Sequence, residues 1–156
     1  MAELVVILQA EDRYVTAGEP SLGEAYSLLK ERWAQGARDL ETGLHLLFLS
    51  WYACSEPPFL TGLPASERTA DMFREVFEHF GGESADEPDV LFAVGLMASL
   101  FPWCIGDETV WQATADRCTA KFRRLIPTGF KPEHFANRGA FGQYFAHMVR
   151  SKTQES

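Results

Sequence analysis

The most apolar stretch of this chain lies within residues 39–55 and has the spacing of a buried helix. Asp39 is a suitable N-terminal cap, and Pro57 ends the pattern because the residue before a proline is driven out of the helical region. A helix that is apolar on nearly every face is buried, and this one is too short to span a bilayer. Two stripes carry the pattern: Leu40, Leu44, Leu47, Phe48 and Trp51, then Leu46, Leu49 and Ala53.

Helical spacing also predicts the elements on either side. Residues 3–13 contain a β-branched run that would suit a strand, but no other segment offers an alternating partner, so we expect a helix. Ser21, followed by Glu24, has the spacing of a capping box. The other expected helices cover residues 21–35, 66–80, 90–103, 107–125 and 138–150, with a helical turn near 132–136.

These patterns predict an all-α protein of six to seven helices. We expect a single domain over residues 1–150 and a frayed tail over residues 151–156. Residues 21–55 and 89–125 each combine an amphipathic helix with a nearly all-apolar one. We therefore expect stacked antiparallel hairpins around the buried helix 39–55.

Composition supports one folded domain, since 46% of the 156 residues are hydrophobic. The cysteines are three in number, and no basic segment precedes the short apolar run near the N-terminus. We therefore expect no secretory signal, no membrane span, a cytoplasmic location and three reduced thiols that act as small buried hydrophobes.

The charge of this chain is unevenly distributed. Residues 1–116 hold 20 acidic and 6 basic side chains, whereas residues 117–156 hold 2 acidic and 8 basic ones. Either the basic C-terminal segment packs against an acidic body, or an acidic surface steers a basic partner. For the second interpretation the candidate binding residues form an acidic loop: Glu83, Asp86, Glu87 and Asp89.

Glu56 is the candidate for a chemical role, because it follows a buried helix whose C-terminal dipole disfavours an anion. Three interpretations remain open. The carboxylate staples the turn at residues 60–62, binds a ligand or acts in catalysis, or points into solvent.

Two Glu-x-x-x-His pairs, Glu41/His45 and Glu75/His79, each share one helix face. Side by side they could hold a metal ion, although di-iron bundles use a spacing of three residues; otherwise they are surface or interface pairs. No zinc-type Cys-x-x-Cys spacing and no glycine-rich phosphate loop occurs, so we expect no cofactor.

Apolar residues at the turns offer a candidate interaction surface. Phe59, Leu60 and Trp103 form either a packed corner or a docking site for another protein. The basic aromatic segment near the C-terminus raises single-stranded nucleic acid as a ligand, but the net charge of −8 argues against it.

We carry three functional hypotheses forward. The first is a protein-binding module with an acidic surface, such as an inhibitor or immunity-type protein that neutralises a basic partner; this is an analogy of size and charge. The second is a helical enzyme or metal-binding protein that uses Glu56, His45 and Glu41. The third is a homo-oligomeric structural protein, for example a homodimer. The lack of a catalytic motif favours the first over the second.

Overall fold

The computed structural model describes residues 1–64 and 66–155, with side chains up to Ser151. The chain is all-helical over these residues and forms no strand there, which confirms the predicted fold class. The elements are α1 (Leu4–Ala17), α2 (Leu22–Ala34), α3 (Leu40–Ser55), α4 (Pro58–Thr61), α5 (Glu67–His79), η1 (Gly82–Ser84), α6 (Pro88–Leu100), η2 (Pro102–Cys104), α7 (Glu108–Leu125), η3 (Pro132–Phe135) and α8 (Gly139–Glu155), where η denotes a 3-10 helix.

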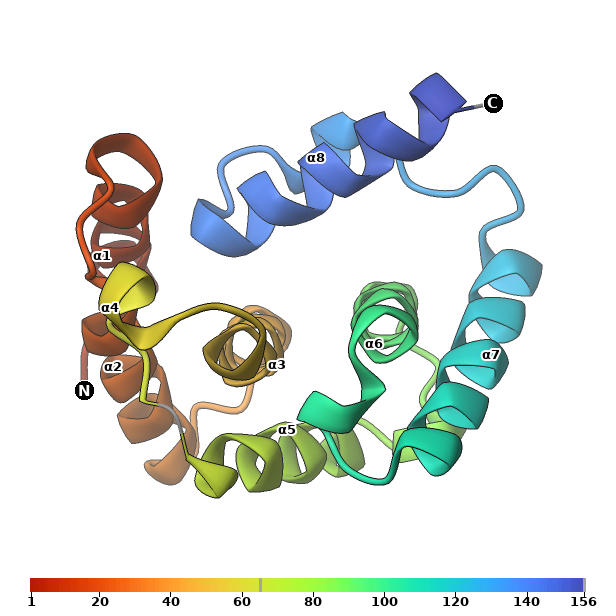
Figure 1. Ribbon diagram of the computed structural model, residues 1–156, viewed down its shortest axis with the longest axis horizontal. Coiled ribbons are helices and arrows are strands. Elements are labelled where there is room, and N and C mark those ends of the chain that lie inside the picture. Colours follow the sequence, from red (N-terminus) through yellow and green to blue (C-terminus); the bar gives the residue numbers. More distant parts are fainter. Residues whose placement is uncertain (65, 156) are drawn as a thin grey trace.

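Two helices, α3 and α6, form the centre of the fold. Figure 1 shows both nearly end-on, with α1 and α2, α5, α7 and α8 arranged around them. The surrounding helices explain why α3 and α6 are apolar on almost every face, since neither presents a broad face to solvent. Asp39 caps α3 as predicted, accepting a hydrogen bond from Thr42 N at 3.1 Å.

The outer helices pack against the central pair in a ring. The two predicted hairpins are present as packed pairs, α2 with α3 and α6 with α7, while α5 lies against α3, and α8 lies against both α1 and α3. The arrangement in Figure 1 is therefore a ring around two central helices instead of hairpins stacked around one. The predicted count of six to seven is too low, because the turn after α3 contains the short helix α4.

Two local predictions need correction. Ser21 makes no capping hydrogen bond to α2; its Oγ donates to Ala10 O at 2.6 Å and so ties α2 to α1. The C-terminal helix continues to Glu155, beyond Arg150, where we expected it to end. Ser156, the last residue of the expected frayed tail, lies outside the described residues.

The prediction of three reduced thiols is wrong. Cys54 and Cys104 form a disulfide that joins the last turn of α3 to η2, with their Cα atoms 5.6 Å apart. Cys118 is free and buried, as expected of a small core residue. The separation of 50 positions between the bonded cysteines explains the failure, because only the packing of η2 beside α3 brings them together.

No helix in the described part of the chain combines the length and the apolar character needed to cross a membrane.

Candidate functional site

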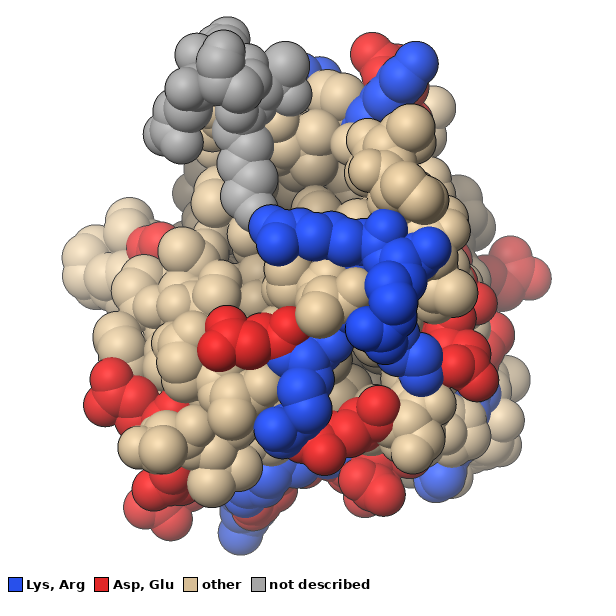
Figure 2. All heavy atoms as spheres, turned by 90° about the vertical axis from the view of Figure 1, so that its right-hand side faces the viewer, with Lys and Arg blue, Asp and Glu red and all other residues tan. Residues whose placement is uncertain are grey.

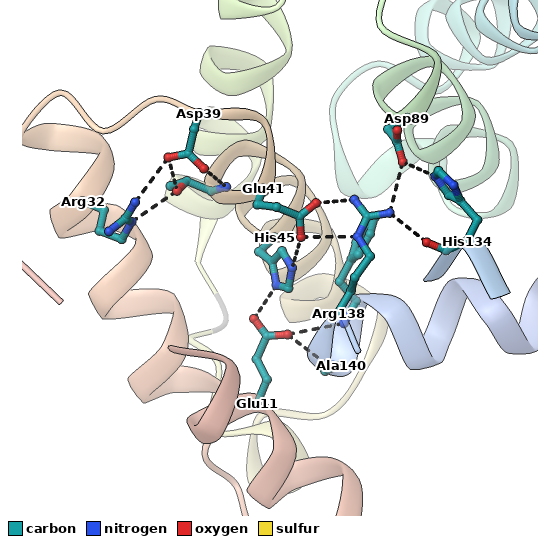
Figure 3. A network of polar contacts seen from close by, with 11 residues as sticks. Glu11, Arg32, Asp39, Glu41, His45, Asp89, His134, Arg138 and Ala140 are labelled. Atoms are coloured by element: carbon teal, nitrogen blue, oxygen red, sulfur yellow. Dashed lines mark hydrogen bonds and ion pairs between the residues drawn. The ribbon is translucent and has the colours of Figure 1, made fainter. Parts of the chain in front are cut away.

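A buried network of charged side chains connects α1, α3 and α8. Glu11 from α1 is fully buried, and its Oε2 lies 2.6 Å from Nδ1 of the buried His45 on α3 (Figure 3). The other ring nitrogen, Nε2, lies 3.3 Å from Glu41 Oε2, close enough for an ion pair although not aligned for a hydrogen bond. Arg138 then bridges Glu41, through two of its nitrogens, and Asp89, at 3.2 Å.

The network fixes the charges of its members. Burial alone would lower the pKa of His45, but the charge and hydrogen bond of Glu11 outweigh burial and raise it to about 9. Burial would raise the pKa of Glu41, yet His45 and Arg138 stabilise the carboxylate and lower it to about 2. At neutral pH His45 is therefore positively charged and Glu41 negatively charged.

Glu11 also caps the last helix. Its Oε1 accepts hydrogen bonds from Ala140 N at 2.9 Å and Phe141 N at 3.4 Å, two of the unpaired amides of the first turn of α8. Gly139 permits this approach, because a Cβ there would lie 2.5 Å from Glu11 Oε1. The network thereby holds the C-terminal helix against the core.

In this network both ring nitrogens of His45 face carboxylates, Nδ1 that of Glu11 and Nε2 that of Glu41. A protonated imidazole has no lone pair to offer, so a metal ion could bind His45 only by displacing its proton. The second predicted pair lies in another setting: Glu75 accepts from Trp33 Nε1 at 3.0 Å, and the His79 ring packs against the same indole. Over the described residues, no group of three or more potential ligands is placed to hold a metal.

Most of the acidic loop is paired within the chain. Glu83 pairs with Arg117, Asp86 with Lys121 at 2.8 Å, and Asp89 with His134 and Arg138. Glu87 alone of the four makes no ion pair within the described part of the chain.

These pairs explain the uneven charge of the chain. Figure 2 shows the side occupied by α7, where Lys and Arg side chains run in a band with Asp and Glu beside them. The basic C-terminal segment therefore packs against the acidic body, the first of the two interpretations drawn from the sequence. In the acidic loop only Glu87 is left without an ion pair among the described residues, so the loop offers a partner little unpaired charge.

A cavity of about 810 Å³ opens where α3 ends. Its wall combines the last turn of α3, the residues entering α4, the first turns of α5, and η2. Glu56 and Trp103 both line it, so the structure places two of the sequence candidates in one site. Trp103 is 57% exposed, and Phe59 and Leu60 on α4, beside the cavity wall, are 79% and 48% exposed.

The charge of the cavity wall is negative. Its ionisable side chains are three carboxylates, Glu56, Glu67 and Asp71, and one guanidinium, Arg74. Arg74 pairs with Asp71 and donates to Ile105 O, which ties α5 to the turn after η2. Two carboxylates, those of Glu56 and Glu67, are left without an ion pair among the described residues.

Glu56 does not staple the turn. The amides of Leu60 and Thr61 donate to Pro57 O, and the amide of Gly62 donates to Pro58 O. Glu56 is half-buried and lines the cavity; burial, together with the charge of Glu56, raises the pKa values of Tyr52 and Tyr144, which lie outside the cavity wall. The ligand-binding and the solvent-facing interpretations both fit this geometry.

Sequence reasoning missed two parts of these sites. Glu11 gave no local signal beyond being a charge within an apolar helix face, and the disulfide in the cavity wall joins distant segments.

No protein-family model, no curated protein and no solved structure matches this chain.

Proposed function

We propose that this chain is a protein-binding module whose cavity between α4 and η2 receives a basic segment of another protein. The observation that carries the proposal is an exposed tryptophan beside an acidic cavity, with Phe59 and Leu60 exposed on the adjoining helix. Tryptophan and other aromatic residues are common anchors of protein interfaces. A single exposed apolar side chain is ordinary on a protein surface, but here Trp103, Phe59 and Leu60 are exposed at or beside the same cavity.

The chemistry of the cavity favours an arginine side chain. A guanidinium stacks on the face of an indole and forms charge-assisted hydrogen bonds with carboxylates. Trp103 and the two carboxylates without ion pairs, Glu56 and Glu67, supply both kinds of contact. Neither carboxylate has an ion-pair partner among the described residues, so both remain available to an incoming cation.

The enzyme hypothesis is less well supported. Glu41 and His45 lie in the buried network, while Glu56 lies beyond the opposite end of α3, and 11 helical residues separate His45 from Glu56 by roughly 16 Å. The three side chains therefore do not form one site. An inhibitor or immunity-type role, in which the module acts by covering its partner, remains a prediction from size and charge. The homo-oligomeric structural role remains a separate hypothesis.

Binding of a capped hexa-arginine peptide, measured by calorimetry at low salt, tests the proposal. We expect Trp103→Ala to raise Kd at least tenfold and Glu56→Gln to raise it severalfold, with Kd rising as salt screens the carboxylates. Val5→Ala removes a comparably exposed apolar side chain (54%) from α1 and should leave Kd unchanged. A hexa-glutamate peptide should not bind.

Glu87→Gln separates the cavity from the acidic loop, since it removes one charge from the loop residue without an ion pair. Equal Kd values for this variant and the unsubstituted protein support the cavity. A larger loss for Glu87→Gln than for Glu56→Gln, or no binding of hexa-arginine, would refute the proposal.

A further inference from the structure

The Cys54–Cys104 disulfide forms part of the wall of the proposed docking cavity. Both cysteines line that cavity. Cys54 is exposed at the last turn of α3, whereas Cys104 is only 5% exposed at the end of η2. The Cys54 end of the disulfide is therefore open to a small reagent in solution, whereas the Cys104 end is covered by the core.

The bond also holds together the two sides of the cavity that carry its candidate contacts. Trp103 immediately precedes Cys104 on η2, and Glu56 follows Cys54 by two residues. In the described chain no other disulfide joins these segments; η2 also packs against α6 and α7, Pro102 and Ile105 are buried, and Arg74 donates a hydrogen bond to Ile105 O. The disulfide is thus the link between the last turn of α3 and η2 that a thiol can open.

We propose that this disulfide is a thiol-accessible modification site, and that its reduction weakens binding at the cavity. The co-reactant is a small thiol. Its thiolate sulfur bonds to Cys54 Sγ, the Cys54–Cys104 bond breaks, and the electron pair leaves on Cys104 Sγ, which takes a proton from water. A second thiol attacks the external sulfur of the mixed disulfide and releases Cys54 as a thiolate. Two small thiols are oxidised to their dimer, and the protein disulfide is reduced.

The third cysteine provides an internal control within the same chain. Cys118 is 2% exposed on α7, and burial raises the pKa of its thiol to about 11. Both properties suppress its reaction with alkylating reagents while the protein is folded, because the thiolate is the reactive form. Labelling of Cys118 thus reports unfolding, and labelling of Cys54 without Cys118 reports reduction of the folded protein.

The effect on binding rests on the proposed function, whereas the reactivity of the disulfide does not. The experiment therefore has two readouts. Folded protein is incubated with reduced glutathione, alkylated with iodoacetamide and mapped by peptide mass spectrometry, while circular dichroism follows the helix content. Binding of hexa-arginine is then measured for the oxidised, the reduced and alkylated, and the Cys54→Ser/Cys104→Ser proteins.

We expect a glutathione adduct or the alkyl group on exposed Cys54, no label on Cys118 and unchanged helix content. We expect hexa-arginine to bind at least fivefold more weakly to the alkylated protein and to the double serine variant, which carries no added group in the cavity. Reduction that begins only as Cys118 becomes labelled would overturn the modification site.

The remaining outcomes separate the two proposals. Ready reduction with an unchanged Kd in the double serine variant would overturn the effect on binding and leave the docking site standing. Failure of the oxidised protein to bind hexa-arginine would refute the docking site, and the labelling pattern would still decide whether the disulfide is thiol-accessible.

Discussion

Removing the charge of Glu11 should destabilise the whole fold. Its Oε2 lies 2.6 Å from His45 Nδ1 in a fully buried pair, and its Oε1 caps α8. Glu11→Gln keeps the shape of the side chain but leaves a buried imidazolium without its main counter-charge. Breaking one side of a buried ion pair costs about 3–5 kcal/mol. We expect the free energy of unfolding at pH 6 to fall by an amount of this order.

The same pair imposes a pH dependence with a definite sign. The pKa of His45 rises from 6.5 to about 9 on folding, so the folded state holds the proton more tightly than the unfolded chain. The resulting stabilisation is complete below pH 6.5 and is lost as the pH rises towards 9. At 1.36 kcal/mol per pKa unit, it amounts to about 3 kcal/mol. In Glu11→Gln this dependence should largely vanish.

Urea unfolding followed by far-ultraviolet circular dichroism, at pH values from 6 to 9, measures both effects. Asp12→Asn is the matched control, because it removes one charge from the next, exposed position of α1; it should change stability by less than about 0.5 kcal/mol. The double variant Glu11→Gln/His45→Gln carries no buried charge at this pair and should be more stable than either single variant. A flat pH profile for the unsubstituted protein, or a loss in Glu11→Gln no larger than in Asp12→Asn, would refute the reasoning.

Three further predictions concern other parts of the fold. Cys54→Ser/Cys104→Ser should lower the free energy of unfolding by about 3–4 kcal/mol, because the bond closes a 50-residue loop, and a reductant should then have no added effect on the melting temperature. Gly62→Ala should cost about 3 kcal/mol, since φ is +78° and a Cβ would lie 2.0 Å from a backbone oxygen, whereas Gly18→Ala, with φ +68° and open space, should cost about 1 kcal/mol in the same urea assay. Because folding lowers the pKa of Glu41 to about 2, its stabilisation is present above pH 4.5 and is lost as the pH falls towards 2; Glu41→Gln should flatten the acid limb of the stability profile, and an unchanged limb would contradict this.

The helices were largely predictable because their signals are local. The apolar spacing from Leu40 to Trp51 indicates a buried helix. Its end signals, Asp39 and Pro57, lie within a few residues of this apolar pattern. The second central helix, α6, shows the same all-round apolar character. The short helix α4 was missed because a single turn between Pro58 and Gly62 has no periodic pattern to detect.

The sequence identified individual candidate residues of the sites, but not which of them lie together in the folded protein. The sequence singled out Glu56 and Trp103, but nothing in it placed them in one cavity, since Glu56 follows α3 and Trp103 lies on η2. The acidic loop was also visible as a candidate surface. Its ion pairs with α7, with His134 on η3 and with Arg138 before α8 depend on residues 34 or more positions away, so the sequence left two interpretations open.

The sequence by itself therefore determined the all-helical class, the most buried helix and the opposing charges of the two parts of the chain. These follow from periodicity, capping and composition, which depend on neighbours within a few positions or on simple counts. Tertiary structure alone decided that Glu11 meets His45 across 34 residues, that Arg138 meets Glu41 across 97, and that Cys54 bonds to Cys104 across 50. Such pairs form because α8 and η2 pack against α3, and α1 packs against α2 and α8; no local rule encodes which distant helix will lie there.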